Sequence, residues 1–416
     1  MLPESTEVVV IGAGPTGLAL SIALHQAGVD HVLVDRLAEG LNTSRAGVIH
    51  AQTLESLAQL GVTERLCSLG LKLQNFAIRD RDRALLKLNF GKLPSTYPCL
   101  MMLPQNLTEQ VLAERIAELD GVIYRSVEAI DVIQKADRAH VTVVESGRSR
   151  TISARYVVGA DGMNSLVRKS AGIEFDGAVY DASFVLADVR MDWQAGPTEV
   201  SLFSAPAGPV VVAPLPDGSY RVVATMNDAP EKPGISDIQA ILDSRGPTES
   251  RVRVIATIWS SRFRVHHRLV RSYRKERLFL MGDAAHVHSP AGGQGMNTGL
   301  VDAVVLGQLL SDVITGRRPE VELDLYEKLR RPAAEEVLAM AGKMTEMALA
   351  RNPVRRFFRN LALSLVNINP FFKRHMGMQL SGLSRAPLAK LPEPANPGIG
   401  MLSAHDDSKS ELKLAA

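Results

Sequence analysis

One stretch near the N-terminus constrains the fold more than any other. Residues 8–35 read VVVIGAGPTGLALSIALHQAGVDHVLVD: a β-branched run, a glycine turn, an apolar helical pattern that ends at Gly28, and a second β-branched run. A strand, a helix and a strand in this order form a βαβ unit, in which the helix carries the chain back across the sheet. The sequence therefore predicts an α/β fold built on a parallel, Rossmann-like sheet.

The glycine turn has the spacing of a dinucleotide-binding site. Gly12 permits the tight turn, Gly14 lets the backbone approach a pyrophosphate, and Gly17 allows the helix to pack closely on the strand. Asp35 ends the second strand at the distance expected of an acid that binds a ribose hydroxyl. Arg36 beside it either lies against the adenine or is solvated. A turn with only a structural role explains fewer of these features than a dinucleotide-binding site does.

Composition limits the class of protein. The 416 residues are 46% hydrophobic and carry a net charge of +2, which is typical of a globular protein and gives no reason to expect nucleic-acid binding. Cys67 and Cys99 show no ligand or disulfide spacing, so a cytoplasmic location is expected. The acidic N-terminus does not resemble a signal peptide. The apolar run 298–316 contains two aspartates, which favours a buried helix over a membrane span.

A second motif lies at residues 277–303, RLFLMGDAAHVHSPAGGQGMNTGLVDA. Asp283 follows an apolar strand, and the loop after it contains more glycines than a turn requires. We therefore expect something bulky to approach the backbone there. His286 and His288 lie close to Asp283, but no further ligand follows at helical or hairpin spacing, so we expect no metal site.

Four segments together resemble one enzyme family. In chain order they are residues 8–36, 44–62, 156–173 and 277–303. This combination resembles the single-component FAD-dependent aromatic hydroxylases typified by para-hydroxybenzoate hydroxylase. The resemblance implies a Rossmann-like FAD-binding fold with an inserted, mainly antiparallel β-sheet substrate domain and a helical C-terminal region. The shorter branch is implied, because a long extra C-terminal domain has no room here.

The resemblance also implies a division of the chain into domains. A discontinuous FAD-binding domain would comprise residues 1–70, 101–175 and 271–330, and a substrate domain would comprise 71–100 and 176–270. C-terminal helices are expected over 331–384. The composition of 385–416, rich in Pro, Gly and small polar residues, predicts a poorly ordered tail.

The resemblance assigns the second motif to the flavin. Asp283 is expected to accept hydrogen bonds from the ribityl chain, and the backbone of Gly295, Met296 and Asn297 to meet the pyrimidine edge. A helix that begins there offers unpaired N–H groups and a partial positive charge to an anionic reduced flavin. Pro290 and the loop 291–295 are expected to shape the substrate cavity. The other residues expected to bind FAD are Gly12, Ala13, Gly14, Pro15, Thr16, Gly17, Asp35, Arg36, Arg45, Gln105, Val127, Asp161 and Gly293.

Five positions are carried over from the family with separate arguments, and four of them have simpler alternatives. Arg45 is expected at the diphosphate, where its fork of donors suits the charge, but it can also be a surface arginine. Gln105 is expected near the ribityl chain or simply beside a helix start, and Val127 near the adenine or as an ordinary strand residue. Asp161 is expected close to the flavin and pyrophosphate. Arg168 follows it at the family's spacing, or forms a salt bridge from a helix.

The function implied is that of an FAD-dependent monooxygenase. It would use NAD(P)H as a transient reductant and dioxygen to hydroxylate a small aromatic or quinoid molecule through a flavin hydroperoxide. The sequence identifies no catalytic acid or base. Two alternatives remain open: a non-oxygenating flavin oxidoreductase acting on a lipophilic substrate, and a non-catalytic flavin- or lipid-binding protein. A monomer and a homodimer are equally compatible with the sequence.

The C-terminal region has an unusual charge pattern. No acidic residue occurs between Glu346 and Glu393, while arginines, lysines and phenylalanines interleave, as in the C-termini of ubiquinone-pathway hydroxylases. The simpler expectation is a helix pair packed on the flavin domain with its basic face in solvent. The alternative is that residues 351–390 form a surface for anionic lipid or a lipophilic substrate.

Overall fold

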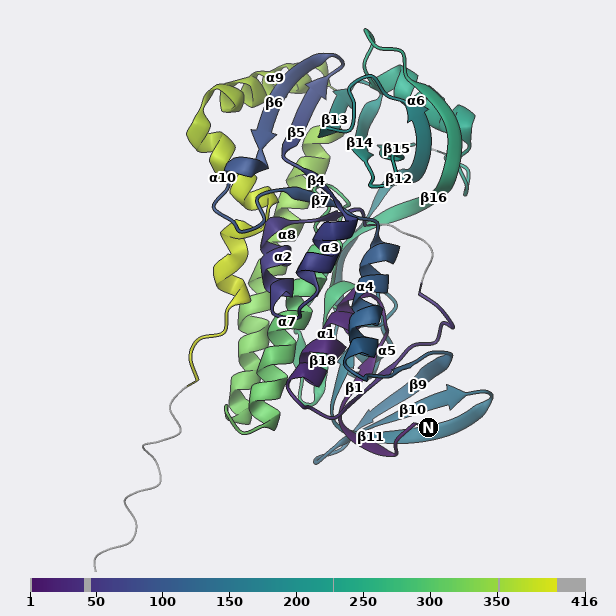
Figure 1. The fold of residues 1–416 in the computed structure, drawn as a ribbon, viewed down its shortest axis with the longest axis vertical. Helices are drawn as coiled ribbons and strands as arrows, with labels where there is room; N and C mark the ends of the chain where they lie inside the picture. Colours follow the sequence, from purple (N-terminus) through teal and green to yellow (C-terminus); the bar gives the residue numbers. More distant parts are fainter. Residues whose placement is uncertain (1, 41–45, 227, 351, 395–416) are drawn as a thin grey trace, which may run out of the picture.

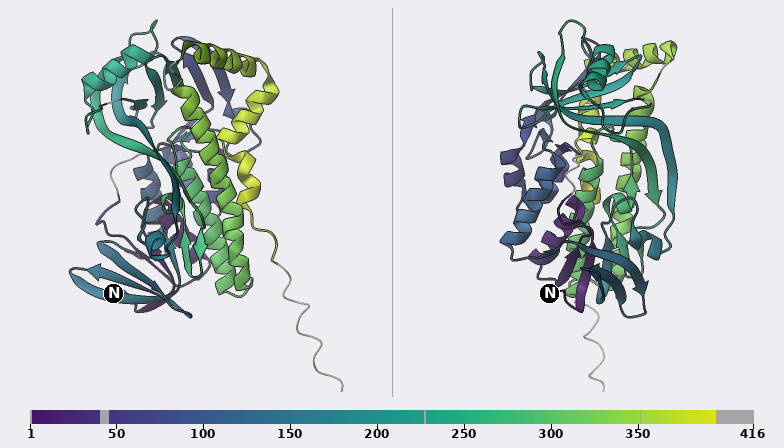
Figure 2. Two further views of the ribbon diagram at one scale, coloured as in Figure 1. Left: turned by 180° about the vertical axis from the view of Figure 1, so that it is seen from behind. Right: turned by 90° about the vertical axis from the view of Figure 1, so that its right-hand side faces the viewer.

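The protein is described by a computed structural model that covers residues 2–40, 46–226, 228–350 and 352–394 (Figure 1). Two eight-stranded sheets lie at opposite ends of an elongated molecule, and long helices run beside them (Figure 2). The predicted fold class, a Rossmann-like α/β fold with an inserted antiparallel sheet and a helical C-terminal region, is confirmed.

The first sheet contains the predicted βαβ unit. Along its main path the strands are β17 (Arg274–Lys275), β18 (Leu278–Leu280), β11 (Arg148–Gly159), β1 (Ser5–Ile11), β2 (His31–Val34) and β8 (Ile123–Tyr124). The strands from β18 to β8 are parallel. The strands β9 (Val127–Gln134) and β10 (Ala139–Glu145) extend β11 as an antiparallel branch.

Helices cover this sheet because its central strands are apolar on both faces. The helix α1 (Pro15–Gln26) packs against α4 (Gln105–Glu118) and α7 (Gly295–Ile314). Of the described helices, α7 alone has the length and composition of a membrane span, but 89% of that window is buried inside the protein. The short α5 (Leu166–Ser170) and the 3-10 turns η2 (Gly282–Ala284) and η3 (Glu320–Asp324) complete this part.

The second sheet is almost entirely antiparallel. Its strands, in spatial order, are β19 (His286–Val287), β16 (Arg253–Val270), β12 (Phe175–Asp192), β15 (Tyr220–Thr225), β14 (Gly208–Pro214), β13 (Glu199–Ala205), β5 (Asn75–Asp80) and β6 (Arg83–Asn89). The parallel pair β13–β5 joins two segments that are distant in sequence. The helix α6 (Ile235–Arg245) packs on this sheet.

A small third sheet lies between the two larger ones (Figure 1). It consists of β3 (Val48–Ile49), β7 (Leu100–Met102) and β4 (Leu71–Leu73). The helices α2 (Ala51–Ala58) and α3 (Thr63–Leu69) and the turn η1 (Phe90–Lys92) belong to the same segments of chain.

The C-terminal region consists of α8 (Leu325–Ala348), α9 (Pro353–Ile368), α10 (Pro370–Leu380) and the turn η4 (Leu383–Ala389). Two expectations about it are wrong. The helices α9 and α10 pack on β6 of the second sheet, and α9 does so through the buried Leu363 and through hydrogen-bonding side chains such as Asn360. Residues 385–394, which composition assigns to the tail, are folded: Arg385 is buried and donates to Gln294 Oε1 (3.0 Å), because a buried guanidinium requires acceptors.

Candidate active site

The predicted site residues follow the carboxyl ends of four parallel strands. These ends are in register, since Ile11 pairs with both Val34 and Gly159, and Gly159 pairs with Leu280. The residues that follow them are Gly12, Asp35, Asp161 and Asp283. Ligands of open α/β sheets bind at this edge, where connections leave a central strand in opposite directions. Four segments far apart in sequence therefore line one cavity.

The three glycines of the turn differ in whether the surrounding structure leaves room for a Cβ. Gly12 has a φ of +103°, and a Cβ there would overlap the carbonyl oxygen of Ala160. A Cβ on Gly17 would overlap the carbonyl oxygen of Gly12. A Cβ on Gly14, in contrast, would have no described atom within 4 Å. The fold explains Gly12 and Gly17, whereas Gly14 leaves space open at the N-terminus of α1.

That N-terminus is suited to an anion. No described side chain forms a capping hydrogen bond at Gly14, and Pro15 is the first helical residue. The backbone N–H groups of the first turn and the helix dipole therefore face the cavity, which Gly14, Pro15 and Thr16 line. This open cradle fits the diphosphate of a dinucleotide.

Asp35 has a structural role as well as a position in the cavity wall. Its Oδ2 accepts from the N–H of Ala13 (2.6 Å), and its Oδ1 accepts from that of Leu37 (2.8 Å). Asp35 thus closes the glycine turn onto β2. Arg36 beside it is exposed at the cavity rim. Arg45 lies outside the described residues.

Asp161 and Arg168 organise the turn after β11. Asp161 Oδ2 accepts from the N–H of Leu166 (2.6 Å), while its Oδ1 is buried without a hydrogen-bond partner among the described residues. Burial raises the pKa of this carboxyl group. Arg168 donates to the carbonyl oxygens of Ala284 (3.0 Å) and Met163 (2.7 Å). Arg168 therefore ties this turn to the turn that carries Asp283, and it does so through carbonyl groups.

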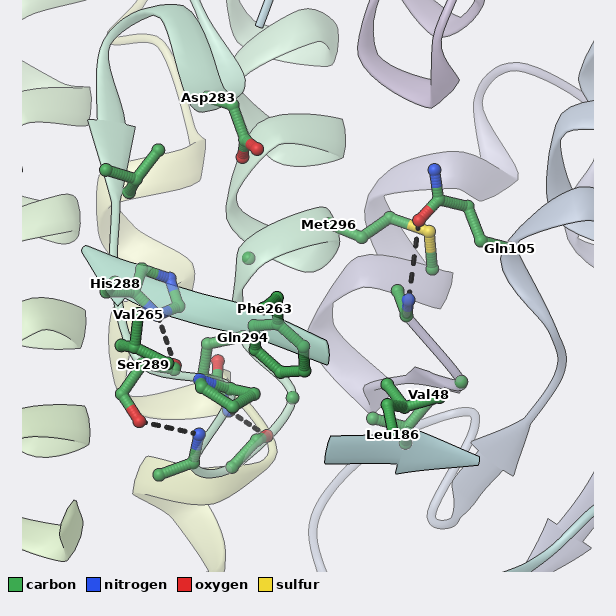
Figure 3. A pocket seen from close by; sticks show the side chains of 18 of the residues that line it. Val48, Gln105, Leu186, Phe263, Val265, Asp283, His288, Ser289, Gln294 and Met296 are labelled. Atoms are coloured by element: carbon green, nitrogen blue, oxygen red, sulfur yellow. Dashed lines mark hydrogen bonds between the residues drawn. The ribbon is translucent and has the colours of Figure 1, made fainter. Parts of the chain in front are cut away.

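Asp283 lies on η2, and its carboxylate projects into the cavity (Figure 3). The backbone around it is tightly packed. Gly282 has a φ of +57°, and a Cβ there would lie 2.9 Å from Thr16 Oγ1. A Cβ on Gly299 of α7 would lie 2.6 Å from the same oxygen. Small residues at these positions allow α1, η2 and α7 to meet, which fixes Asp283 relative to the glycine turn.

The loop before α7 also contains glycines of two kinds. Gly292 and Gly293 have φ values of +82° and +62°, a conformation that favours glycine. Gly295 has no positive φ, and a Cβ there would contact only the His288 ring, 3.9 Å away. The protein itself can therefore accommodate a Cβ at position 295. The absence of one leaves the N-terminus of α7 accessible from the cavity.

Side-chain hydrogen bonds hold this loop in place. The Asn297 side chain is buried, accepts from the N–H of His50 (2.8 Å) and donates to the carbonyl oxygens of Val48 (2.9 Å) and Gly293 (2.8 Å). His50 Nε2 lies 2.8 Å from the carbonyl oxygen of Gly292. Burial lowers the pKa of His50 to about 4. The sequence predicts only a backbone contact for Asn297. That its side chain and His50 hold the loop in place is a finding that no local motif indicates.

The remaining predicted residues also line the cavity. Gln105 Nε2 donates to Glu109 Oε1 (2.8 Å), and Gln105 and Met296 both line the cavity (Figure 3). Val127 is buried and donates its N–H to the carbonyl oxygen of Asp35 (2.9 Å). Pro290 lies at the other end of the loop from Gly295. Among the described residues, every predicted cofactor residue except Ala13, Gly17 and Asn297 lines this cavity.

The cavity has a volume of about 1250 Å³ and continues past the loop 290–295 into an apolar space, the chamber, between the second sheet and the C-terminal helices. The chamber is lined by Phe76, Ile78, Leu100, Met102, Phe184, Leu186, Val200, Leu202, Val211, Val223, Phe263, Val265, Met344, Leu363, Met376 and Leu380. A typical site for one small ligand occupies roughly 300–1,000 Å³. The cavity therefore has room for a cofactor and a second molecule.

Arg221 joins the two parts of the cavity, and no sequence pattern pointed to it. Its guanidinium is buried and binds both carboxylate oxygens of Asp188 (2.8 and 2.7 Å). It also donates to the carbonyl oxygen of Ala46 (2.7 Å), in the segment that leads into β3. Arg221 therefore holds the second sheet against the loop region beside the first.

Comparison with known proteins agrees with this geometry. The family model described as "FAD binding domain" matches residues 5–341. The 6-methylpretetramide 4-monooxygenase of Streptomyces rimosus is 34% identical over 408 residues, 96% of this chain and 73% of that protein. Pentachlorophenol 4-monooxygenase of Sphingobium chlorophenolicum is 32% identical. The match covers 82% of this chain and 65% of that protein.

The chain is also similar to solved structures of hydroxylases and monooxygenases. The anhydrotetracycline hydroxylase of Streptomyces rimosus has a TM-score of 0.76 and 32% identity, covering 91% of this chain and 76% of its own. The p-nitrophenol 4-monooxygenase of Pseudomonas putida, at 23% identity, shares the fold with a TM-score of 0.82, over 92% of this chain and 99% of its own. The chain therefore belongs to the FAD-binding family of flavin-dependent aromatic monooxygenases.

Proposed function

We propose that FAD lies along the carboxyl edge of the first sheet, from the glycine turn to the N-terminus of α7, and that the chamber holds a multi-ring aromatic substrate. The observation that carries this proposal is a single cavity. It is lined by Gly14, Asp283 and Gly295, and it continues without interruption into the apolar chamber.

The glycine turn would hold the dinucleotide end of FAD. The uncapped N-terminus of α1 offers backbone donors and a positive dipole end to the diphosphate. Asp35 and Arg36 would lie by the adenosine, and Arg45 would add charge near the diphosphate. Asp161, whose buried Oδ1 has no hydrogen-bond partner in the described part of the chain, would accept a hydrogen bond from the cofactor or the reductant.

The other end of the cavity would hold the flavin ring. Asp283 would accept hydrogen bonds from ribityl hydroxyls, and Gln105 would flank the same chain. The N–H groups at the start of α7 would face the ring edge where negative charge collects on reduction. When bound, FAD accepts a hydride from NAD(P)H and, with dioxygen, supplies the oxygen atom that is added to the substrate.

The chamber would position the substrate and exclude water. Its walls are mostly aliphatic and aromatic side chains, so it favours an apolar ring system over a small polar phenol. Arg221 and the loop 290–295 would set the boundary between substrate and cofactor. The names of several relatives, among them 6-methylpretetramide 4-monooxygenase and anhydrotetracycline monooxygenase, refer to tetracycline-type compounds, which supports a multi-ring substrate.

The proposal is tested by incubating the purified protein with FAD, NAD(P)H and ¹⁸O-labelled dioxygen and a panel of phenols. The panel pairs single-ring phenols with fused multi-ring phenols, and products are analysed by mass spectrometry. We expect one labelled oxygen atom in a multi-ring product and little product from single rings. Labelled product from single-ring phenols alone would contradict the assignment of the substrate. Reduction of a panel compound without label would favour the non-oxygenating alternative.

A further inference from the structure

The helix α9 is amphipathic, but its apolar face points away from the protein. Val354, Phe357, Phe358, Leu361, Leu365 and Ile368 recur at helical spacing and are all exposed. Phe371 and Phe372 at the start of α10 continue the same surface. We call these eight residues the apolar face, and their exposed fractions range from 46% to 79%. In the described part of the chain, every exposed phenylalanine belongs to it.

The opposite side of α9 faces the protein: Leu363 is buried there, and polar side chains beside it make the hydrogen bonds that hold the helix in place. Asn360 Nδ2 donates to Asp80 Oδ2 (2.9 Å), and Arg359 donates to the carbonyl oxygens of Met347 (3.1 Å) and Ser204 (3.4 Å). Asn367 Oδ1 accepts from the N–H of Lys87 on β6 (3.0 Å). These bonds fix the rotation of α9, so the apolar face cannot turn inward without breaking them.

Exposure of eight large apolar side chains to water does not stabilise a folded protein. Burying one such side chain is favourable by about 1.5–3 kcal/mol, and contiguous exposed patches on proteins usually mark interaction sites. In Figures 1 and 2 the two helices form an outer edge of the molecule beside β5 and β6, where none of the other described helices and strands covers them. The apolar face is therefore positioned to meet an external partner.

Charge indicates the kind of partner. Exposed Arg355 and Arg374 and half-buried Lys373 accompany the apolar face, and no acidic residue occurs from 347 to 392. If a second copy of the chain docked symmetrically through this face, it would oppose like charges. An anionic lipid bilayer satisfies both features, because its headgroups attract Arg and Lys while its acyl region accepts Phe, Leu and Ile.

We propose that α9 and α10 dock the protein on the surface of an anionic membrane, with the apolar face buried at the boundary between headgroups and acyl chains. The protein would lie on the bilayer and not span it. Aromatic side chains suit this depth, and basic side chains at the rim would reach the headgroups.

The test is co-sedimentation of the full-length holoprotein with vesicles. One set contains phosphatidylcholine alone and the other an equal mixture of phosphatidylcholine and phosphatidylglycerol. We expect binding to the mixed vesicles to be about tenfold or more tighter than to the neutral ones, and to weaken as salt is added. The double variant Phe358→Asn/Phe371→Asn should bind mixed vesicles about a hundredfold more weakly, since each lost phenylalanine contributes about tenfold.

The matched control is Val122→Asn/Val321→Asn, which removes two exposed apolar side chains elsewhere and should bind mixed vesicles as the wild type does. Bound FAD and circular dichroism confirm that each variant is folded. Wild-type protein that stays in the supernatant with mixed vesicles would overturn the proposal. So would a dimer, seen by sedimentation velocity, that the phenylalanine variant dissociates, because the apolar face would then be a subunit interface.

Discussion

Asp302 of α7 binds Arg330 of α8 through Oδ1 and His286 of β19 through Oδ2, each at 2.7 Å, and its side chain is completely buried. Burial raises the pKa of Asp302, but Arg330 and His286 outweigh it and hold the pKa below its usual range. The carboxylate is therefore charged at neutral pH. Asp302 joins α7 and α8 next to the turn that carries Asp283.

The variant Asp302→Asn should destabilise the protein strongly. It leaves the buried Arg330 without its anion, and breaking a buried ion pair in this way costs about 3–5 kcal/mol. Denaturant unfolding of the holoprotein measures the effect. The control Asp324→Asn removes the exposed partner of Arg274 and should cost no more than about 1 kcal/mol. Equal losses in the free energy of unfolding of the two variants would show that the buried ion pair is no more important for stability than the exposed one.

The variant Asp283→Ala should weaken FAD binding and leave the fold intact. Loss of a hydrogen bond to a charged group costs about 1.5–3 kcal/mol, which corresponds to about a ten- to hundredfold higher Kd. Titration of the apoprotein with FAD, followed by fluorescence, measures it. Asp137→Ala removes an exposed loop carboxylate that does not line the cavity and should bind FAD normally. An unchanged Kd for Asp283→Ala would restrict Asp283 to a structural role.

The variant Gly295→Val tests whether the start of α7 stabilises reduced flavin. The fold accommodates a Cβ at this position, so a loss of function would come from displacing the ring. The flavin midpoint potential should fall by on the order of 10–40 mV, equivalent to about 0.5–2 kcal/mol, and reduction by NAD(P)H should slow. Gly234→Val is the matched control, since Gly234 caps α6 outside the cavity. A native potential in folded, FAD-loaded Gly295→Val would refute the electrostatic role.

His50 should make folding stability depend on pH under mildly acidic conditions. Its pKa of about 4 in the folded state is below the unfolded value of about 6.5, so the unfolded chain binds more protons between these values. Stability should therefore fall as the pH drops from about 6.5 to about 4, by up to about 1.4 kcal/mol per pH unit for this group.

The variant His50→Gln should lose that part of the slope. Denaturant unfolding at several pH values would show a flatter profile than the wild type by about one proton. His375→Gln, at an exposed position on α10, should keep the wild-type profile. A His50→Gln profile that matches the wild type would mean that His50 becomes protonated in the folded protein as readily as in the unfolded chain.

The local patterns of the sequence predicted the parts of the site that depend on backbone geometry. Gly17 is required by a contact with Gly12 inside the βαβ unit, Gly12 has the positive φ of the turn itself, and Asp283 follows a strand whose apolar run is evident. These features are encoded over short distances. The fold class could be predicted for the same reason, since strand and helix periodicities are local.

Other parts depend on contacts that no local pattern contains. Arg221 reaches Ala46 across 175 positions of sequence, and His50 reaches Asn297 across 247. The orientation of α9 was missed for a related reason. Periodicity shows that the helix has two faces, but only the acceptors on β5 and at the end of α8 and the Lys87 N–H donor on β6 determine which face packs inward.

The hydrogen bond from Arg385 to Gln294 has a consequence for biosynthesis. These residues are 91 positions apart, and Gln294 also donates to the carbonyl oxygen of Leu380. While the chain is still on the ribosome, the loop that begins α7 emerges long before the residues that anchor it. The hydrogen bonds of Gln294 with Leu380 and Arg385 can form only after α8, α9 and α10 have been translated and folded back. Complete anchoring of this loop is therefore a late step in the folding of the chain.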